Sequence, residues 1–196
     1  MNIVIRRYES GLCYCRPDTT CEKENRDFYV PESIIDIQWS PVLFVRISKA
    51  GKCIGKKFVS RYYDTFSFGA LMYCSDNKTD TVNDLNIAFS SCVDHSSLLP
   101  SPSYDLSGLE SGETHYQVRK NGEAIYTSGC QDGDKYLKTL IEDTVCLASQ
   151  LTSLRIGDIV AVELAEITRL ASRDEKEISF AGEYGDTTLF DTKIIF

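Results

Sequence analysis

Residues 114–128 constrain the fold more than any other segment, because they predict a β-hairpin. Polar and apolar side chains alternate over residues 114–120, and residues 123–128 form the returning strand. Between them, Asn121 and Gly122 supply the two positive φ angles of a type I′ turn. The chain therefore contains at least one tight antiparallel pair of strands.

Further strands are predicted on both sides of this hairpin. They are residues 28–30, 42–48, 68–74, 159–164 and 187–196, which are apolar runs or alternate in polarity. A continuous apolar run such as residues 159–164 is typical of a strand that is buried on both faces. The strand over residues 28–30 is short because Pro31 ends it.

Helices are fewer than strands. Apolar side chains fall on one face of a helix over residues 137–151, and Asp132 or Asp134 can cap its start. Residues 56–66 fit a shorter helix, residues 94–112 read as a long surface loop, and residues 1–27 show no clear period. This mixed order predicts a β-rich α+β fold, a mixed β-roll or sandwich with a few short helices.

Length and charge restrict the class of protein. A chain of 196 residues is the size of one domain and can bury a core without staples. Its net charge of -8 argues against a nucleic acid or an anionic membrane as partner, because both are bound through Lys and Arg. The first residues contain no long apolar run and include Arg6 and Arg7, so we expect a cytoplasmic protein with its eight cysteines free.

Several segments, in order, resemble the fumarylacetoacetate hydrolase family. They are Arg16-Pro17-Asp18, residues 28–31, residues 42–47, residues 61–64, residues 69–76, the Asn-Gly hairpin, and residues 154–159. The resemblance runs from about Cys13 to Phe196 and implies one domain over residues 1–196, shortened at its N-terminus. It also implies a β-roll fold, small oxo-acid substrates, a hard divalent cation such as Mg²⁺, and a homodimer.

The resemblance locates the metal ligands, and this chain lacks them. The family binds its cation with a Glu-x-Glu pair on one strand and an Asp on a later strand; residues i and i+2 of a strand share a face and can share one ion. These three positions fall on Ser40, Val42 and Leu71. Residues 37–63 and 65–75 contain no Asp or Glu, so a shift in alignment does not restore the carboxylates. We therefore expect neither Mg²⁺ nor Mn²⁺ to bind as a cofactor.

Other positions implied by the family are also altered. The basic residue of its Lys-Pro motif persists as Arg16, and Gln38 replaces a histidine beside the glutamates. The pocket lysine falls near Ile87, and a Thr-Gly-Thr-Pro loop falls on residues 162–165, which include Leu164. The segment between Asp76 and Phe89 is shorter than the family's lid. The residual pocket predicted from this resemblance consists of Arg16, Gln38, Ser40, Val42, Leu71, Ile87 and Leu164.

Residues outside this pocket offer three weaker candidates for chemistry. Glu32, Asp36, Asp64 and Asp76 could form a new carboxylate cluster, although loop charges are the simpler interpretation. Cys92 and His95 suggest a nucleophile and base, but their loop supplies no oxyanion hole. Cys13, Cys15 and Cys21 could begin a zinc site, but no second closely spaced cysteine pair completes it.

Three functional hypotheses follow. The first is a catalytically inactive family member with a binding or assembly role, because the ligand carboxylates are missing. The second is an active hydrolase, isomerase or decarboxylase with relocated or metal-independent chemistry, in which Arg16 and Arg46 pair with the carboxylate of a small oxo-acid. The third is a regulatory subunit that pairs with an active paralogue. A homodimer or such a heterodimer is the expected assembly.

Overall fold

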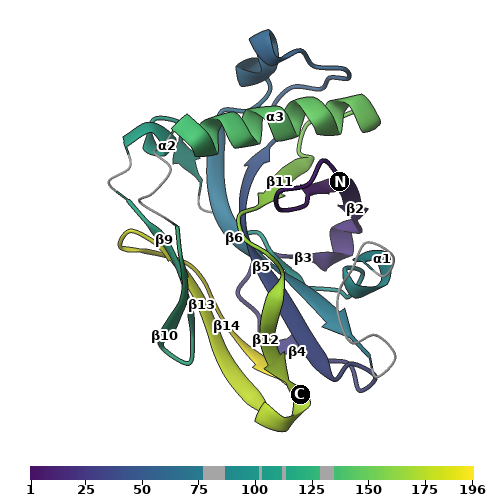
Figure 1. Cartoon of the computed structure of the whole chain (residues 1–196), viewed down its shortest axis with the longest axis vertical. Helices are drawn as coiled ribbons and strands as arrows, with labels where there is room; N and C mark the ends of the chain where they lie inside the picture. Colours follow the sequence, from purple (N-terminus) through teal and green to yellow (C-terminus); the bar gives the residue numbers. More distant parts are fainter. Residues whose placement is uncertain (77–86, 102, 112–113, 129–134) are drawn as a thin grey trace.

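The computed structural model describes residues 1–76, 87–101, 103–111, 114–128 and 135–196. Within these residues the strands form a nine-stranded sheet and a five-stranded sheet (Figure 1). This confirms the predicted α+β, β-rich class.

The larger sheet surrounds two long central strands, β5 (Asp36–Arg46) and β6 (Thr65–Ser75). Its order is β2 (Cys13–Arg16), β1 (Ile3–Arg6), β11 (Ile159–Glu163), β5, β6, β7 (Ser97–Leu98) and β3 (Cys21–Glu22), with β12 (Thr168–Ser172) beside β5 and β8 (Tyr104–Asp105) beside β6. β1 joins β11 in parallel, with Ile3 opposite Ile159. The first strand of the chain therefore lies inside the sheet, next to a strand formed more than 150 residues later.

The smaller sheet has the order β10 (Glu123–Thr127), β9 (Tyr116–Lys120), β13 (Glu177–Tyr184), β14 (Thr187–Ile195) and β4 (Phe28–Tyr29). The longest helix, α3 (Lys135–Leu151), crosses the end of the larger sheet (Figure 1). The short helical segments are α1 (Ile87–Ser90), α2 (Gly108–Ser111), η1 (Asp18–Thr20), η2 (Lys56–Arg61) and η3 (Arg173–Glu175).

Strand β5 separates two apolar clusters because its side chains alternate between the faces of the sheet. Trp39, Leu43 and Val45 belong to the main core, which the smaller sheet and α3 complete. Aromatic contacts fill this core; for example, the Trp39 and Phe180 rings meet edge to face at 5.3 Å between centroids. Val42 and Phe44 point to the opposite face and enter a second cluster. The candidate site lies on that second face.

The predicted hairpin is confirmed as β9 and β10, with positive φ angles at Asn121 (51°) and Gly122 (83°). We expect Gly122→Ala to destabilise the protein by about 1–2 kcal/mol, because a Cβ is unfavourable in this left-handed conformation. Gly55→Ala is the matched control, because both glycines are open to solvent but Gly55 has a φ of -79°. Urea unfolding of both variants measures the difference, and equal stabilities would contradict the turn assignment.

Other predictions need correction. Residues 1–27 contain β1, β2 and β3 although their sequence shows no clear period, because each of these strands is too short to show one and β1 is buried between two others. The predicted surface loop over residues 94–112 is wrong for residues 96–100, which are buried and include β7. The helix expected over residues 56–66 is a 3₁₀ segment over Lys56–Arg61, and β6 begins at Thr65. The caps proposed at Asp132 and Asp134 lie outside the described residues.

No helix within the described ranges is long and apolar enough to cross a membrane.

Candidate functional site

The register of β5 and β6 brings the three predicted metal-ligand positions together. Ser40 is paired with Leu71, and Val42 is paired with Gly69. Their side chains therefore share one face of the sheet. Val42 and Leu71 have no solvent exposure and pack with Phe44, Ile87 and Leu99 in the second apolar cluster. The face that the resemblance assigns to a cation is thus built from apolar side chains.

The Ser40 side chain is also bonded within the protein. Its hydroxyl donates a hydrogen bond to the carbonyl oxygen of Ala165 at 2.8 Å and is fully buried. Gln38 pairs with Tyr73 across the same two strands and is nearly buried. Leu164 lies apart from these residues, because it packs against the main core on the other face. The residue before it, Glu163, is opposite Val42 and lies on the same face as the metal-ligand positions.

Arg16 is the last residue of β2 and is 2% exposed. Its guanidinium donates to the Met72 carbonyl at 2.9 Å and to the Ser97 hydroxyl at 3.0 Å. It also lies over the Tyr73 ring, 4.6 Å from the centroid. Ile87, from α1, belongs to the same apolar cluster as Tyr73. Of the seven predicted pocket residues, Leu164 is thus the one that the structure places on the other face.

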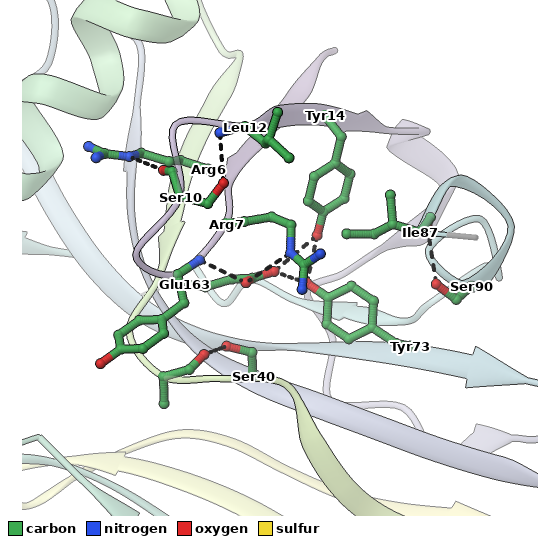
Figure 2. Close-up of polar contacts among 12 residues, drawn as sticks. Arg6, Arg7, Ser10, Leu12, Tyr14, Ser40, Tyr73, Ile87, Ser90 and Glu163 are labelled. Atoms are coloured by element: carbon green, nitrogen blue, oxygen red, sulfur yellow. Dashed lines mark hydrogen bonds and ion pairs between the residues drawn. The ribbon is translucent and has the colours of Figure 1, made fainter. Parts of the chain in front are cut away.

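A buried carboxylate occupies the centre of this face. Glu163 is the last residue of β11, is opposite Val42 in the sheet and is 1% exposed (Figure 2). The Tyr73 hydroxyl donates a short hydrogen bond to Glu163 Oε1, and the Tyr14 hydroxyl is 3.3 Å from the same oxygen. The backbone N–H of Tyr8 donates to Oε2 at 3.1 Å. Donors from two strands and a turn thus converge on one carboxylate.

The charge of Glu163 is met by Arg7, whose Nε lies 4.0 Å from Oε2 (Figure 2). Burial raises the pKa of both Tyr14 and Tyr73 above the usual value, so both rings are neutral hydroxyl donors at physiological pH. Their hydroxyl oxygens are 2.6 Å apart, which links the two rings directly. We call Arg7, Tyr14, Tyr73 and Glu163 the Glu163 network.

The sequence contains a signal for this network in the apolar run over residues 159–164, which the resemblance to the family does not use. Glu163 is the only charged residue in the apolar run 159–164. A charge in a strand buried on both faces needs partners, because an unpaired buried carboxylate is very costly. The positions of Tyr14 and Arg7 could not be inferred, because β1 and β2 were not predicted.

A hard cation does not fit the residues on this face. Such an ion needs several oxygen ligands, mostly carboxylates, whereas Val42 and Leu71 provide none and Ser40 is bonded to the backbone. Glu163 is one carboxylate, and it already accepts hydrogen bonds from Tyr8 and Tyr73. Within the described ranges, no three His, Cys, Asp or Glu side chains form a metal-binding group. Among the described residues, Glu32, Asp36, Asp64, Asp76 and the N-terminal cysteines therefore belong to no such group.

The pair of Cys92 and His95 does not form a nucleophile and base. The Cys92 thiol donates to the Ala88 carbonyl at 2.7 Å, whereas His95 Nδ1 lies 2.8 Å from Glu22 Oε2. His95, but not Cys92, lines a groove of about 590 Å³, together with Arg26, Asp27, Phe28, Tyr29, Pro31, Val93 and Asp94. None of the seven predicted pocket residues lines it.

The Glu22–His95 contact predicts a pH dependence. Burial raises the pKa of Glu22, but the N–H of Glu24, the His95 ring and the N–H of Lys23 outweigh it, so the pKa lies below its usual value. Glu22 therefore stabilises the fold above the unfolded pKa of about 4.3, and this contribution is lost as pH falls through the lower folded value. Between pH 5 and pH 3, urea unfolding of the wild type should lose more free energy than that of Glu22→Gln. Parallel pH profiles would contradict this.

The two curled sheets, with the site on one face of the larger one, define the fold of the fumarylacetoacetate hydrolase proteins. Solved structures that are similar to this chain include fumarylpyruvate hydrolase from Pseudomonas aeruginosa, in complex with Mn²⁺ and pyruvate. Its TM-score is 0.71, with 16% identity over 94% of this chain and 78% of that chain. They also include 2-hydroxyhepta-2,4-diene-1,7-dioate isomerase from Mycobacterium marinum, at a TM-score of 0.77 and 11% identity over 99% and 74%. A Yersinia pestis CO92 protein assigned to the family matches at 0.74 and 16% over 99% and 92%.

No protein-family model and no curated protein matches the sequence.

Proposed function

We propose that this chain is a catalytically inactive relative of the fumarylacetoacetate hydrolase family that acts by binding or assembly. One observation carries the proposal: the ligand positions Val42 and Leu71 are closed into an apolar cluster, and the Ser40 hydroxyl is bonded to Ala165. An enzyme that holds a keto-enol substrate on a cation needs carboxylates at that place. We also propose that no Mg²⁺ or Mn²⁺ is bound there.

Calorimetric titration of the chelator-treated protein with Mn²⁺ and Mg²⁺, with and without oxalate, tests this function. Oxalate imitates the enolate form of an oxo-acid. We expect no saturable heat with either metal and no oxalate binding. Metal binding with a defined stoichiometry that strengthens with oxalate would refute the proposal and would indicate a rebuilt site.

A second function is favoured by the Glu163 network. Glu163 places a carboxylate on the face that carries the metal-ligand positions. It accepts a hydrogen bond from Tyr73, which is bonded to Tyr14 and lies against the buried cation Arg16. An active hydrolase, isomerase or decarboxylase could use such a group for metal-independent proton transfer on a small oxo-acid. Turnover of an acylpyruvate or oxaloacetate that disappears in Glu163→Gln would establish this alternative.

Assembly is the remaining part of the proposal. A homodimer, or a heterodimer with a catalytically active paralogue, is consistent with a fold retained after loss of its ligands, because packing and metal ligation use different residues. Sedimentation of the purified chain, alone and with a paralogue from the same source, distinguishes these assemblies.

A further inference from the structure

The net charge of -8 conceals a strongly basic surface. Residues 37–63 contain no acidic residue, and the exposed cations of this stretch lie between the end of β5 and the end of η2. We call the following exposed residues the basic patch: the cations Lys49, Lys52, Lys57, Arg61 and Arg155, with the apolar residues Phe58, Leu151 and Ile156.

Backbone hydrogen bonds hold the two halves of the basic patch together. Gly51 and Leu154 exchange two bonds, at 3.0 Å and 2.9 Å. The N–H of Cys53 donates to the Ser149 carbonyl at 2.8 Å, and the N–H of Ile54 donates to the Ser149 hydroxyl at the same distance. Residues 49–61 are thus fixed against the C-terminal end of α3, and η2 projects beyond that helix at one end of the molecule (Figure 1).

The cations of the basic patch are available for a partner. Lys56, beside them, is neutralised by Asp143 at 2.6 Å. In the described part of the chain, no ion pair involves Lys52, Lys57 or Arg61; Lys57 and Arg61 instead lie 6.0 Å and 5.2 Å from the Phe58 ring centroid. Phe58, Leu151 and Ile156 are 46%, 62% and 72% exposed, so they add apolar surface to the basic patch.

We propose that the basic patch binds the surface of a membrane that contains anionic lipids. Lysines and arginines near such a surface each contribute about 1 kcal/mol, and apolar side chains between them enter the interface. The patch combines both features, with Phe58 among the cations of η2 and Ile156 after Arg155. Acidic residues also border the basic patch: Asp143 is paired with Lys56, and Asp64 follows Arg61 by three residues. Acidic residues farther away act weakly, because screening confines charge interactions to about 10 Å.

Two other classes of partner fit less well. A nucleic acid gains nothing from exposed aliphatic side chains such as Leu151 and Ile156, because its affinity comes from phosphate contacts. The cores of protein–protein interfaces are depleted in lysine, whereas the basic patch contains Lys49, Lys52 and Lys57. The basic patch contains none of the metal-ligand positions, which lie on a face of the larger sheet.

Co-sedimentation of the whole chain with vesicles tests this proposal. We expect binding to vesicles of equal parts phosphatidylcholine and phosphatidylserine, little binding to phosphatidylcholine alone, and release at high salt. The double variant Lys52→Glu, Lys57→Glu should bind the anionic vesicles at least about tenfold more weakly. Phe58→Ser should bind them more weakly while it keeps the salt dependence, because it removes apolar insertion and no charge.

The matched control is Lys176→Glu, Lys193→Glu, which changes the net charge equally but lies near the C-terminus, at the other end of the molecule in Figure 1. It should retain most of the binding, and thermal melts check that each variant is folded. Absence of binding to the anionic vesicles, an equal loss in the control, or tighter binding to a short DNA duplex than to the vesicles would each overturn the proposal.

Discussion

Glu163→Ala is expected to lower the free energy of unfolding by about 3–5 kcal/mol, the usual cost of breaking a buried charged pair. The substitution removes the carboxylate that accepts from the Tyr73 and Tyr14 hydroxyls, which keep only the hydrogen bond between them. It also leaves Arg7 without its carboxylate and the Tyr8 N–H without its acceptor. Urea unfolding followed by circular dichroism measures the loss.

Glu183→Ala is the control for this prediction. Glu183 also lies in a strand, but it is 40% exposed and its ion pair with Arg119 is 3.6 Å long. Exposed pairs of this kind contribute about 0–1 kcal/mol, so the control should unfold almost as the wild type does. Comparable losses in the two variants would mean that the Glu163 network does not hold the sheet together.

Leu71→Asp is expected to have the second large effect, a loss of about 4 kcal/mol or more, because it places a carboxylate in a fully buried apolar cluster. This substitution restores an acid at a ligand position, but Ser40 and Val42 add no second carboxylate. Mn²⁺ is therefore not expected to recover the stability. Chemical unfolding with and without the metal provides both measurements.

Leu71→Ala separates the effect of lost volume from the effect of charge. A buried Leu→Ala change costs about 2–5 kcal/mol, so the aspartate variant should be clearly less stable than the alanine variant. The difference in unfolding free energy between the two variants should become smaller as pH falls, because the aspartate is then protonated. Equal stability of the two variants at neutral pH would mean that water or a cation reaches position 71, contrary to the packing described above.

The sequence predicted the parts of this fold that depend on local pattern. The hairpin at Asn121-Gly122, the strand that begins at Ile159 and the helix that ends at Leu151 each carry their own signal of turn type or period. The short strand β7 does not, because two residues show no period and their burial depends on pairing with β6 and β3. The strands β12 and β13 were not predicted either.

The candidate site depends on pairing between strands. The three metal-ligand positions were taken from the family resemblance, and the face on which Leu71 lies relative to Ser40 and Val42 depends on the register of β5 and β6, which local pattern does not give. The partners of Glu163 come from β6, from β2 and from the segment between β1 and β2, which approach Glu163 only in three dimensions. Contacts between residues so far apart in sequence leave no local periodicity, so Tyr14 and Arg7 could not be assigned.

The central place of β1 has a consequence for the order of events during synthesis. Ile3–Arg6 is synthesised more than 150 residues before its partner Ile159–Glu163. The larger sheet therefore cannot close co-translationally until most of the chain is present, and its central strand β5 lacks one neighbour until then. Such a topology favours slow folding, during which a strand edge stays exposed.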